Sequence, residues 1–303
     1  MAERIVIAIP TYKRPKSLKR LLDAIAGLMT EMDVAVLVAD NDSEKHEGLD
    51  LCRQMAGSYR WPLTAVIAHE RGIAQVRNTL VEQALADPAM QFVAMIDDDE
   101  WPEQHWLDQF IAVQRQTGAD LLQGSILFDH EGPGPAPVPD IRRPTGPILM
   151  LQGAGNLLIA RKVLEETAKP WFDPAFALTG GEDHEFFMRL AKAGRRFAWA
   201  DDARAHGDVP EARRDLSWVL ARAYSTGNSD MRVLLKHQNG AGMVLRESGK
   251  IAGALLLSPL LAVILAASPN RRLASLQTLF RAAGKLTAMF GARYNEYSVV
   301  HGE

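Results

Sequence analysis

Four consecutive acids, Asp97, Asp98, Asp99 and Glu100, follow directly on the apolar run FVAMI at residues 92–96. Where an Asp-x-Asp stretch leaves a strand, Asp97 and Asp99 can point their carboxylates to one side while Asp98 turns elsewhere. Such oxygen ligands suit Mg²⁺ or Mn²⁺, which commonly bind one or two carboxylates together with substrate phosphates. The stretch therefore predicts a divalent metal site. The alternative is a solvated turn, or a cluster of acids that caps the next helix.

Apolar runs that alternate with helix-periodic segments indicate the fold that positions these acids. Continuous apolar strands separated by amphipathic helices predict an α/β fold, with a mostly parallel sheet flanked by helices on both faces. The expected strands cover residues 4–10, 34–40, 64–70 and 92–97, and the expected helices cover residues 18–28, 72–87 and 102–118.

The chain beyond residue 118 continues with less regular alternation. Its proline-rich segment, 131–147, predicts a surface loop. A helix is expected over 180–194, with Phe186, Phe187, Leu190 and Ala193 on one side. The remaining expected elements are a strand at 119–129, a strand and a helix within 151–166, and a strand beginning at 197–200.

Acidic side chains gather where the predicted strands end. Asp40 and Asp42 follow the second strand, and Glu70 with Arg71 follows the third. In parallel α/β sheets, ligands bind at the carboxyl ends of the strands, so these residues are expected to meet at one edge. The alternative for Asp40 and Asp42 is that they only form turns.

Composition excludes several classes of function. The 303 residues hold 34 Lys plus Arg and 37 Asp plus Glu, a net charge of −3, which gives no general attraction to nucleic acid. The single cysteine, Cys52, excludes an internal disulfide and a cysteine-based zinc site. We therefore expect a cytoplasmic protein, and the short apolar stretch at the N-terminus predicts no secretory signal.

Five motifs occur in the order and spacing of a known family. They are IAIPTYKRPKSLKRLLDAI, VADNDSE, ERGIAQVRNTLVEQA, AMIDDDEWPEQHWLDQF and GGEDHEFFMRLAKAG. Together they resemble the family 2 glycosyltransferases, which have the Rossmann-like GT-A fold, over about residues 3–230. The resemblance implies an inverting hexosyltransferase that moves a sugar from a nucleotide diphosphate sugar, here a UDP-sugar, to an acceptor hydroxyl. The later stretch HGDVPEARRDLSWVLARAYSTGNSDMR is similar to enzymes that build bacterial exopolysaccharide units on a lipid carrier, as in succinoglycan assembly.

The resemblance also implies roles for individual residues. Asp97 and Asp99 would hold Mn²⁺ or Mg²⁺, and His206 would complete the metal or phosphate site. Asp183 would be the catalytic base, with Glu182 as the alternative base. The residues implied at the nucleotide sugar are Pro10, Thr11, Tyr12, Arg14, Asp40, Asp42, Arg77 and Asp98.

The chemistry of sugar transfer needs these residue types. The departing diphosphate gains negative charge, which a cation and Arg77 would stabilise. The acceptor hydroxyl loses its proton as it attacks, and a positioned carboxylate such as Asp183 typically contributes ~10²- to 10⁴-fold. A helix start favours the ionised carboxylate and makes it a weaker base. The alternative is that Glu182 and Asp183 only cap a helix behind a glycine pair.

Other residues have plain structural alternatives. Arg77 on an amphipathic helix is ordinarily a surface residue, and a lone histidine such as His206 is ordinarily a structural one. Tryptophans that pack in a core cannot be separated by sequence from tryptophans that stack on a sugar face. The chain holds four candidates for either role, Trp101, Trp106, Trp171 and Trp218.

Competing functions fit less well. A nucleotidyltransferase would grip triphosphate with a glycine-rich loop after the first strand, whereas IPTYKRPKS contains no glycine. A dehalogenase-type phosphatase would have Asp-x-Asp-x-Thr, and Trp101 occupies the last position. The remaining alternative is a non-catalytic subunit that binds nucleotide sugar or acts as a scaffold in a membrane polysaccharide assembly.

The C-terminal residues differ from the rest in character. Residues 251–268 hold no charge, contain Pro259, and precede a basic amphipathic segment at 270–294. Three interpretations are open: a membrane-spanning helix, a hairpin that lies on or dips into the membrane, or a hairpin buried against the catalytic domain. We expect a domain at 1–230 and a helical extension at 231–303. The extension would bind the cytoplasmic face of the inner membrane, where a lipid-linked acceptor lies.

Overall fold

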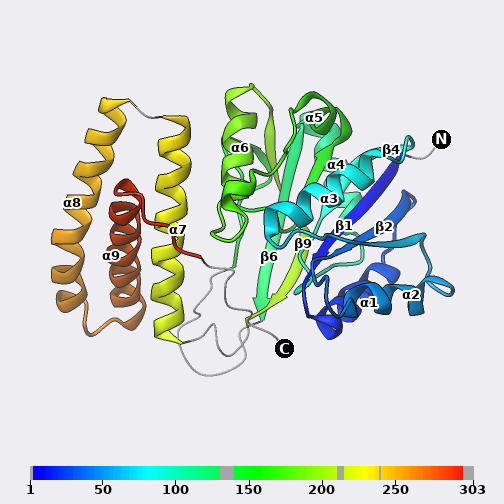
Figure 1. Cartoon of the computed structure of the whole chain (residues 1–303), viewed down its shortest axis with the longest axis horizontal. Coiled ribbons are helices and arrows are strands. Elements are labelled where there is room, and N and C mark those ends of the chain that lie inside the picture. Colours follow the sequence, from blue (N-terminus) through cyan, green and yellow to red (C-terminus); the bar gives the residue numbers. More distant parts are fainter. Residues whose placement is uncertain (1–2, 130–139, 210–214, 239, 296–303) are drawn as a thin grey trace.

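The computed structural model describes residues 3–129, 140–209, 215–238 and 240–295. Within these residues a nine-stranded sheet is covered by helices on both faces, and three C-terminal helices stand beside it (Figure 1). The strands are β1 Arg4–Thr11, β2 Asp33–Asp40, β3 Leu63–Ile67, β4 Met90–Met95, β5 Glu100–Pro102, β6 Leu121–Asp129, β7 Gly146–Ile148, β8 Leu157–Ala160 and β9 Phe197–Asp208. The helices are α1 Pro15–Ala26, α2 Glu47–Ala56, α3 Ile73–Leu85, α4 Trp106–Thr117, α5 Arg161–Glu166, the 3₁₀ turn η1 Pro174–Phe176, α6 Glu182–Lys192, α7 Leu216–His237, α8 Ala241–Ile264 and α9 Pro269–Met289.

The N-terminal half of the sheet is parallel, in the order β3-β2-β1-β4. These strands match the four apolar runs, and most of their residues are buried because helices cover both faces. Helix α1 begins with a proline at its first position and buries Leu18, Leu21, Leu22 and Ile25, which share one face at helical spacing. Helix α2 was not predicted, because its ten residues are fewer than the window of about 11–18 over which helical periodicity is read.

The other half of the sheet is mixed rather than mostly parallel. Strand β8 pairs antiparallel with both β4 and β6, and β9 runs parallel to β6 while β5 and β7 pair antiparallel with it. Short strands that follow without a crossover helix can enter antiparallel, which continuous apolar runs do not reveal. The α/β fold class is confirmed, and so are the strand at 121–129, the strand and helix within 157–166, and helix α6.

Three boundaries differ from the expected ones. Helix α4 begins at Trp106 rather than at residue 102, because Glu100–Pro102 form β5. Ala193 is exposed, since α6 ends one residue before it. Of the expected loop at 131–147, residues 131–139 lie outside the described part of the chain, and β7 begins at Gly146.

The three C-terminal helices form a unit in which α9 packs against both α7 and α8 (Figure 1). A Cβ atom added to Gly227 of α7 would lie 2.0 Å from the carbonyl oxygen of Arg281, and one added to Gly284 of α9 would lie 2.0 Å from that of Tyr224. The two backbones are therefore in direct contact. Buried Asn228 extends this contact by donating to the carbonyl oxygen of Ala292 at 3.0 Å.

Helix α8 lies on the outside of this unit and presents apolar residues to solvent. It continues through Pro259, and within the described residues it alone is long and apolar enough to cross a membrane by length and composition. Only 22% of its most apolar 18-residue stretch is buried. The exposed apolar side chains in its C-terminal half are Leu256, Leu257, Leu260, Leu261, Val263 and Ile264.

A glycine-to-alanine substitution is predicted to change the free energy of unfolding in opposite directions at Gly284, inside the contact between α7 and α9, and at Gly249, outside it. Gly284→Ala is expected to lower the free energy of unfolding by about 1–3 kcal/mol, because the added methyl group forces the helices apart. Gly249→Ala in α8, where a Cβ atom meets nothing within 4 Å, is expected to raise it by up to about 1 kcal/mol. Urea unfolding measures both. A stabilising Gly284→Ala would contradict the close contact.

Candidate active site

A cavity of about 820 Å³ lies between the carboxyl ends of the sheet strands and the C-terminal helices. The sheet side of its wall includes the four acids that follow β4 and residues that follow β1. The helical side comes from α7 and α9. The cavity thus has the position at which ligands bind in open α/β sheets. The nucleotide-binding candidates that line it, at the end of β1 and directly after it, are Pro10, Thr11, Tyr12 and Arg14.

Asp98 ties the end of β4 to the loop that follows β1. The Thr11 hydroxyl donates to its Oδ2 at 2.8 Å, and Arg14 Nη1 donates to its Oδ1 at 3.3 Å and to Asp99 Oδ2 at 2.9 Å. Burial, with the neighbouring charge of Asp99, raises the pKa of Asp98 to about 7 in spite of Arg14. The buried carboxyl group of Asp98 therefore holds together the end of β1 and the end of β4, which both line the cavity.

Arg77 of α3 bridges the acids after β4 and the start of α6. Its Nη2 donates to Asp97 Oδ1 at 3.1 Å, and its Nη1 donates to Glu182 Oε1. Arg77 is only 5% exposed, so it is not an ordinary surface arginine. Because both partners are acidic and the guanidinium group is buried, its position is fixed before any ligand binds.

The start of α6 holds the two candidate bases in different environments. Gly180 and Gly181 precede the helix with φ of 71° and 94°, a conformation that glycine adopts without strain. Glu182 is buried, and burial together with the charge of Asp183 raises its pKa to about 7. Asp183 is half-buried and its Oδ1 accepts from the backbone N–H of His184 at 2.7 Å. Neither residue is part of the cavity's lining, although Glu182 reaches it through Arg77.

Glu100 is a fourth acid of the site, to which the sequence assigned no role. It lines the cavity, is 7% exposed, and its Oε2 has no hydrogen-bond partner within the described residues. A Cβ atom on Gly155 would lie 2.7 Å from Glu100 Oε1, so a larger residue there would displace this carboxyl group from its position. Burial, followed by the charges of Asp97 and Asp99, raises the pKa of Glu100 well above its ordinary value.

The two acids after β2 hold the backbone rather than face the cavity. The Asp40 carboxylate accepts from the N–H groups of Asp42 at 2.9 Å, Gly48 at 2.9 Å and Leu49 at 3.0 Å, and it thereby caps α2. Asp42 is also buried, and its Oδ1 accepts from the Glu44 N–H at 3.2 Å. Neither carboxyl group lines the cavity, and this geometry agrees with the turn-forming interpretation.

Asn41, between these two acids, is the residue of this loop that does line the cavity. Its amide donates to the carbonyl oxygens of Ala68 at 2.9 Å and Glu70 at 2.8 Å, and it accepts from the Gly72 N–H at 2.8 Å. Asn41 therefore fixes the loop that carries Arg71 into the cavity wall. Sequence reasoning missed it because its bonds reach residues some thirty positions away.

His206 lies apart from the predicted metal ligands. Its ring stacks on Trp101 with centroids 5.8 Å apart, and its Nε2 lies 3.2 Å from Glu103 Oε1. It lines a separate cavity of about 540 Å³, whereas Asp97 and Asp99 line the larger one. β9 pairing with β5 places its side chain beside Trp101, and the role of His206 at the metal or phosphate site stays a prediction.

The donor set after β4 fits a hard divalent cation only in part. Asp97 and Asp99 both supply carboxylate oxygens to the cavity, which suits Mg²⁺ or Mn²⁺. Among the described residues, no group of three or more His, Cys, Asp or Glu side chains is arranged to hold a metal ion. A cation here would take its remaining oxygens from a bound ligand and from water, as Mg²⁺ commonly does.

Known proteins are similar to this chain in sequence and in architecture. The sequence profile described as "Glycosyl transferase family 2" matches residues 6–162, which is more than half of the chain. The chain belongs to glycosyl transferase family 2. It is 28% identical to the succinoglycan biosynthesis protein ExoM of Rhizobium meliloti (strain 1021) over 267 residues, which cover 82% of this glycosyltransferase and 79% of that protein.

Solved structures show the same GT-A fold. The mannosyltransferase PcManGT from Pyrobaculum calidifontis, in complex with GDP-Man and Mn²⁺, has a TM-score of 0.65 at 18% identity and covers 97% of this chain and 89% of its own. S. aureus TarS 1–349 in complex with UDP-GlcNAc has a TM-score of 0.53 at 16% identity, covering 99% and 95%. The expected GT-A fold and its C-terminal helices are confirmed.

The raised pKa of Glu182 predicts how stability depends on pH. A carboxyl group whose pKa is higher in the folded state than its ordinary 4.5 stabilises the fold below that value, and this contribution is lost as pH rises through about 7. Without added metal and with EDTA, the wild type should therefore lose about 2 kcal/mol more than Glu182→Gln between pH 5 and pH 8.

Urea midpoints at the two pH values measure this difference. Glu82→Gln is the matched control, because Glu82 has a 63% exposed side chain on the neighbouring helix α3 and should leave the pH dependence unchanged. Parallel pH profiles for the wild type and Glu182→Gln would contradict the prediction.

Proposed function

We propose that this glycosyltransferase moves a sugar from a nucleotide diphosphate sugar, a UDP-sugar, to an acceptor hydroxyl with inversion and with the aid of Mn²⁺ or Mg²⁺. The acceptor is a lipid-linked glycan in the synthesis of exopolysaccharide or another cell-surface polysaccharide. The observation that carries the proposal is the chain of charged side chains Asp97–Arg77–Glu182 beside the cavity, in which Arg77 and Glu182 are buried. The similarity to the succinoglycan biosynthesis protein ExoM supports the polysaccharide class.

The donor half of the cavity supplies the groups that a nucleoside diphosphate needs. Pro10, Thr11, Tyr12 and Arg14, at the end of β1 and directly after it, would form the nucleotide wall, and Asp97 with Asp99 would hold the cation. A bound cation would stabilise the charge that develops on the departing diphosphate. Arg77 adds a fixed positive charge that needs no rearrangement as the bond breaks.

The start of α6 supplies the proton acceptor. In a single displacement the acceptor oxygen bonds to the anomeric carbon, the bond from that carbon to the diphosphate oxygen breaks, and the hydroxyl proton goes to a carboxylate. Asp183 is the proposed base because it is half-exposed, whereas Glu182 is buried and occupied by Arg77. Glu182 is then the residue that positions Arg77 against Asp97.

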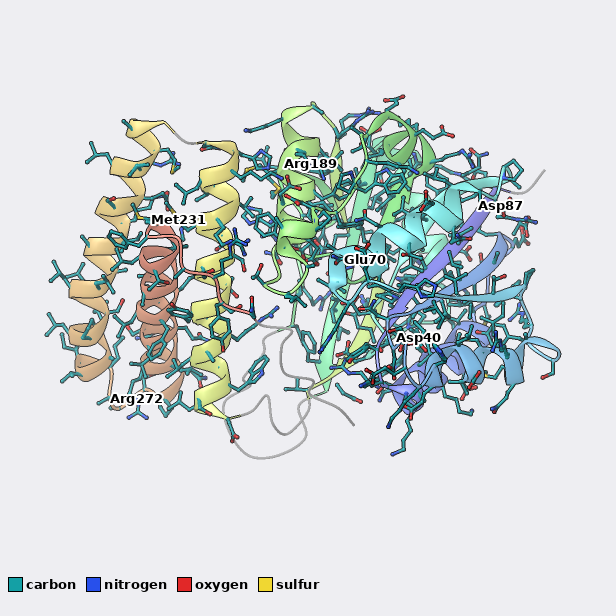
Figure 2. All side chains as sticks on the ribbon, viewed as in Figure 1. Asp40, Glu70, Asp87, Arg189, Met231 and Arg272 are labelled. Carbon is teal, nitrogen blue, oxygen red and sulfur yellow. The ribbon has the colours of Figure 1, made fainter. Side chains whose placement is uncertain are left out.

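A membrane surface is the proposed location of the acceptor. The exposed apolar residues in the second half of α8 lie next to the turn that leads into α9, and Arg271 and Arg272 are exposed at the start of α9. Figure 2 shows Arg272 at this lower end of the helical unit. Apolar side chains beside basic ones suit insertion among anionic headgroups, so we place this end on the cytoplasmic face of the inner membrane.

Removal of the proposed cation ligands tests the function directly. Asp97→Asn and Asp99→Asn are each expected to lower turnover about 10²-fold or more, because the departing charge loses its compensation. The assay measures nucleoside diphosphate released from a panel of nucleotide sugars, with Mn²⁺ or with EDTA. Asp23→Asn, at a 55% exposed side chain on α1, is the control. Unchanged turnover and unchanged Mn²⁺ dependence in both variants would overturn the proposal.

Substitution of Asp183 tests proton removal separately from donor binding. Asp183→Asn is expected to lower kcat by ~10²- to 10⁴-fold, because the acceptor hydroxyl loses its base. Donor affinity, measured by calorimetry, should stay unchanged, since Arg77 and its two acidic partners remain. Asp202→Asn, at a 63% exposed side chain, is the control. A variant that keeps full kcat would exclude Asp183 as the base.

A further inference from the structure

We propose that Arg222 of α7 and Arg281 of α9 form a second anion site in the cavity, which binds a phosphate group carried by the acceptor. This inference rests on the proposed function, because it assigns the sheet side of the cavity to the donor. It adds the chemical class of the acceptor, a phosphorylated amphiphile, and the residues that recognise it.

Among the described residues, acids line only the sheet side of the cavity. That side carries Asp97, Asp98, Asp99, Glu100 and Asp208 together with Arg14, Arg71 and Arg77, whereas the lining residues of α7 and α9 include no acid. From these two helices Arg222 and Arg281 both line the cavity, together with the hydrogen-bonding side chains of Thr226, Gln277 and Thr278. Arginine and hydroxyl or amide donors on one wall match the oxygens of a phosphate group.

Arg281 is held in position before any ligand binds. Its Nε and Nη2 donate to Asp230 Oδ2 at 3.1 and 2.5 Å, which leaves Nη1 outside this ion pair. Asp230 Oδ1 in turn lies 3.2 Å from His184 Nδ1. Burial raises the pKa of Asp230, but the hydrogen bond with His184 and the charge of Arg281 outweigh it, so the net shift is downward. An ionised Asp230 thus fixes the guanidinium group at the cavity wall.

The same bonds set the distance from this anion site to the proposed base. His184 follows Asp183 directly in α6, and Asp230 connects it to Arg281 across α7. A phosphate bound at Arg281 and Arg222 would therefore lie at a fixed separation from Asp183. An acceptor anchored by its phosphate would present one hydroxyl to that base, which is a positional basis for regiospecificity.

The apolar surface of α8 lies at the same end of the helical unit as Arg222, whereas Arg281 lies near the middle of α9. Helix α7 is antiparallel to α8, and α8 is antiparallel to α9 (Figure 1). Arg222 is in the first half of α7, and Leu256 and Val263, 76% and 74% exposed, are in the second half of α8. A molecule with its phosphate in the cavity could thus place an apolar chain in a membrane contacted by α8.

The test measures phosphate binding with the donor site filled. The full-length chain is saturated with UDP and Mg²⁺, and hexyl phosphate is titrated by calorimetry. Arg222→Gln and Arg281→Gln should each weaken hexyl phosphate at least about tenfold, the usual scale for a lost charge-assisted hydrogen bond. UDP affinity should not change. Arg272→Gln, on α9 but outside the cavity lining, should bind as the wild type does, and Arg281→Lys should recover part of the loss.

Two further arms separate the outcomes. Arg222 takes no part in the bonds among Arg281, Asp230 and His184, so Arg222→Gln decides the case even if Arg281→Gln unfolds. If inorganic phosphate binds as tightly as hexyl phosphate, the proposal that the acceptor is an amphiphile is overturned. Hexyl phosphate that binds both glutamine variants as tightly as the wild type, with UDP bound, would overturn the anion site and leave the proposed function standing. Absence of UDP binding would instead remove the proposed function, and hexyl phosphate titrated alone would still test the two arginines.

Discussion

The geometry of the site depends on a single buried guanidinium group. Arg77 lies between Asp97 after β4 and Glu182 at the start of α6, and so connects the acids at the edge of the sheet to a helix that follows about a hundred residues later. A buried arginine without acidic partners would be costly, and the buried Glu182 without Arg77 would be costly as well. The three charges therefore stabilise one another only in this arrangement, which fixes the distance between α6 and the acids after β4.

The acids around Arg77 form two groups with different tasks. Asp98 and Glu100 are buried, and their pKa values are raised, so near neutral pH they are held closer to the protonated form than an exposed carboxyl group would be. Asp97 and Asp99 line the cavity and accept hydrogen bonds from Arg77 and Arg14. Four adjacent acids can thus lie at one strand end because they do not all carry a full negative charge at once.

Sequence patterns predicted the parts of this structure that depend on local periodicity. The parallel strands β1–β4 and helices α1, α3 and α6 follow from apolar spacing, and the acids after β4 were expected where they lie. Long-range pairing was out of reach. His206 is separated from the metal candidates because β9 pairs with β5, and Asp40 is turned to the backbone by α2, a helix that was not predicted. Contacts between distant segments bring three further residues to the cavity, and the spacing of residues in the sequence does not predict such contacts. They are Asn41, Arg222 and Arg281.

The direct contact between α7 and α9 also has a consequence for the order of synthesis. Helix α9 follows α8 in the chain, yet it packs against α7 through Gly227 and Gly284, and its side chains complete one wall of the cavity. A nascent chain that has emerged from the ribosome only through α8 would already hold the strands and acids of the sheet, but it would lack that wall. The binding cavity therefore matures only after α9 has been translated and has docked.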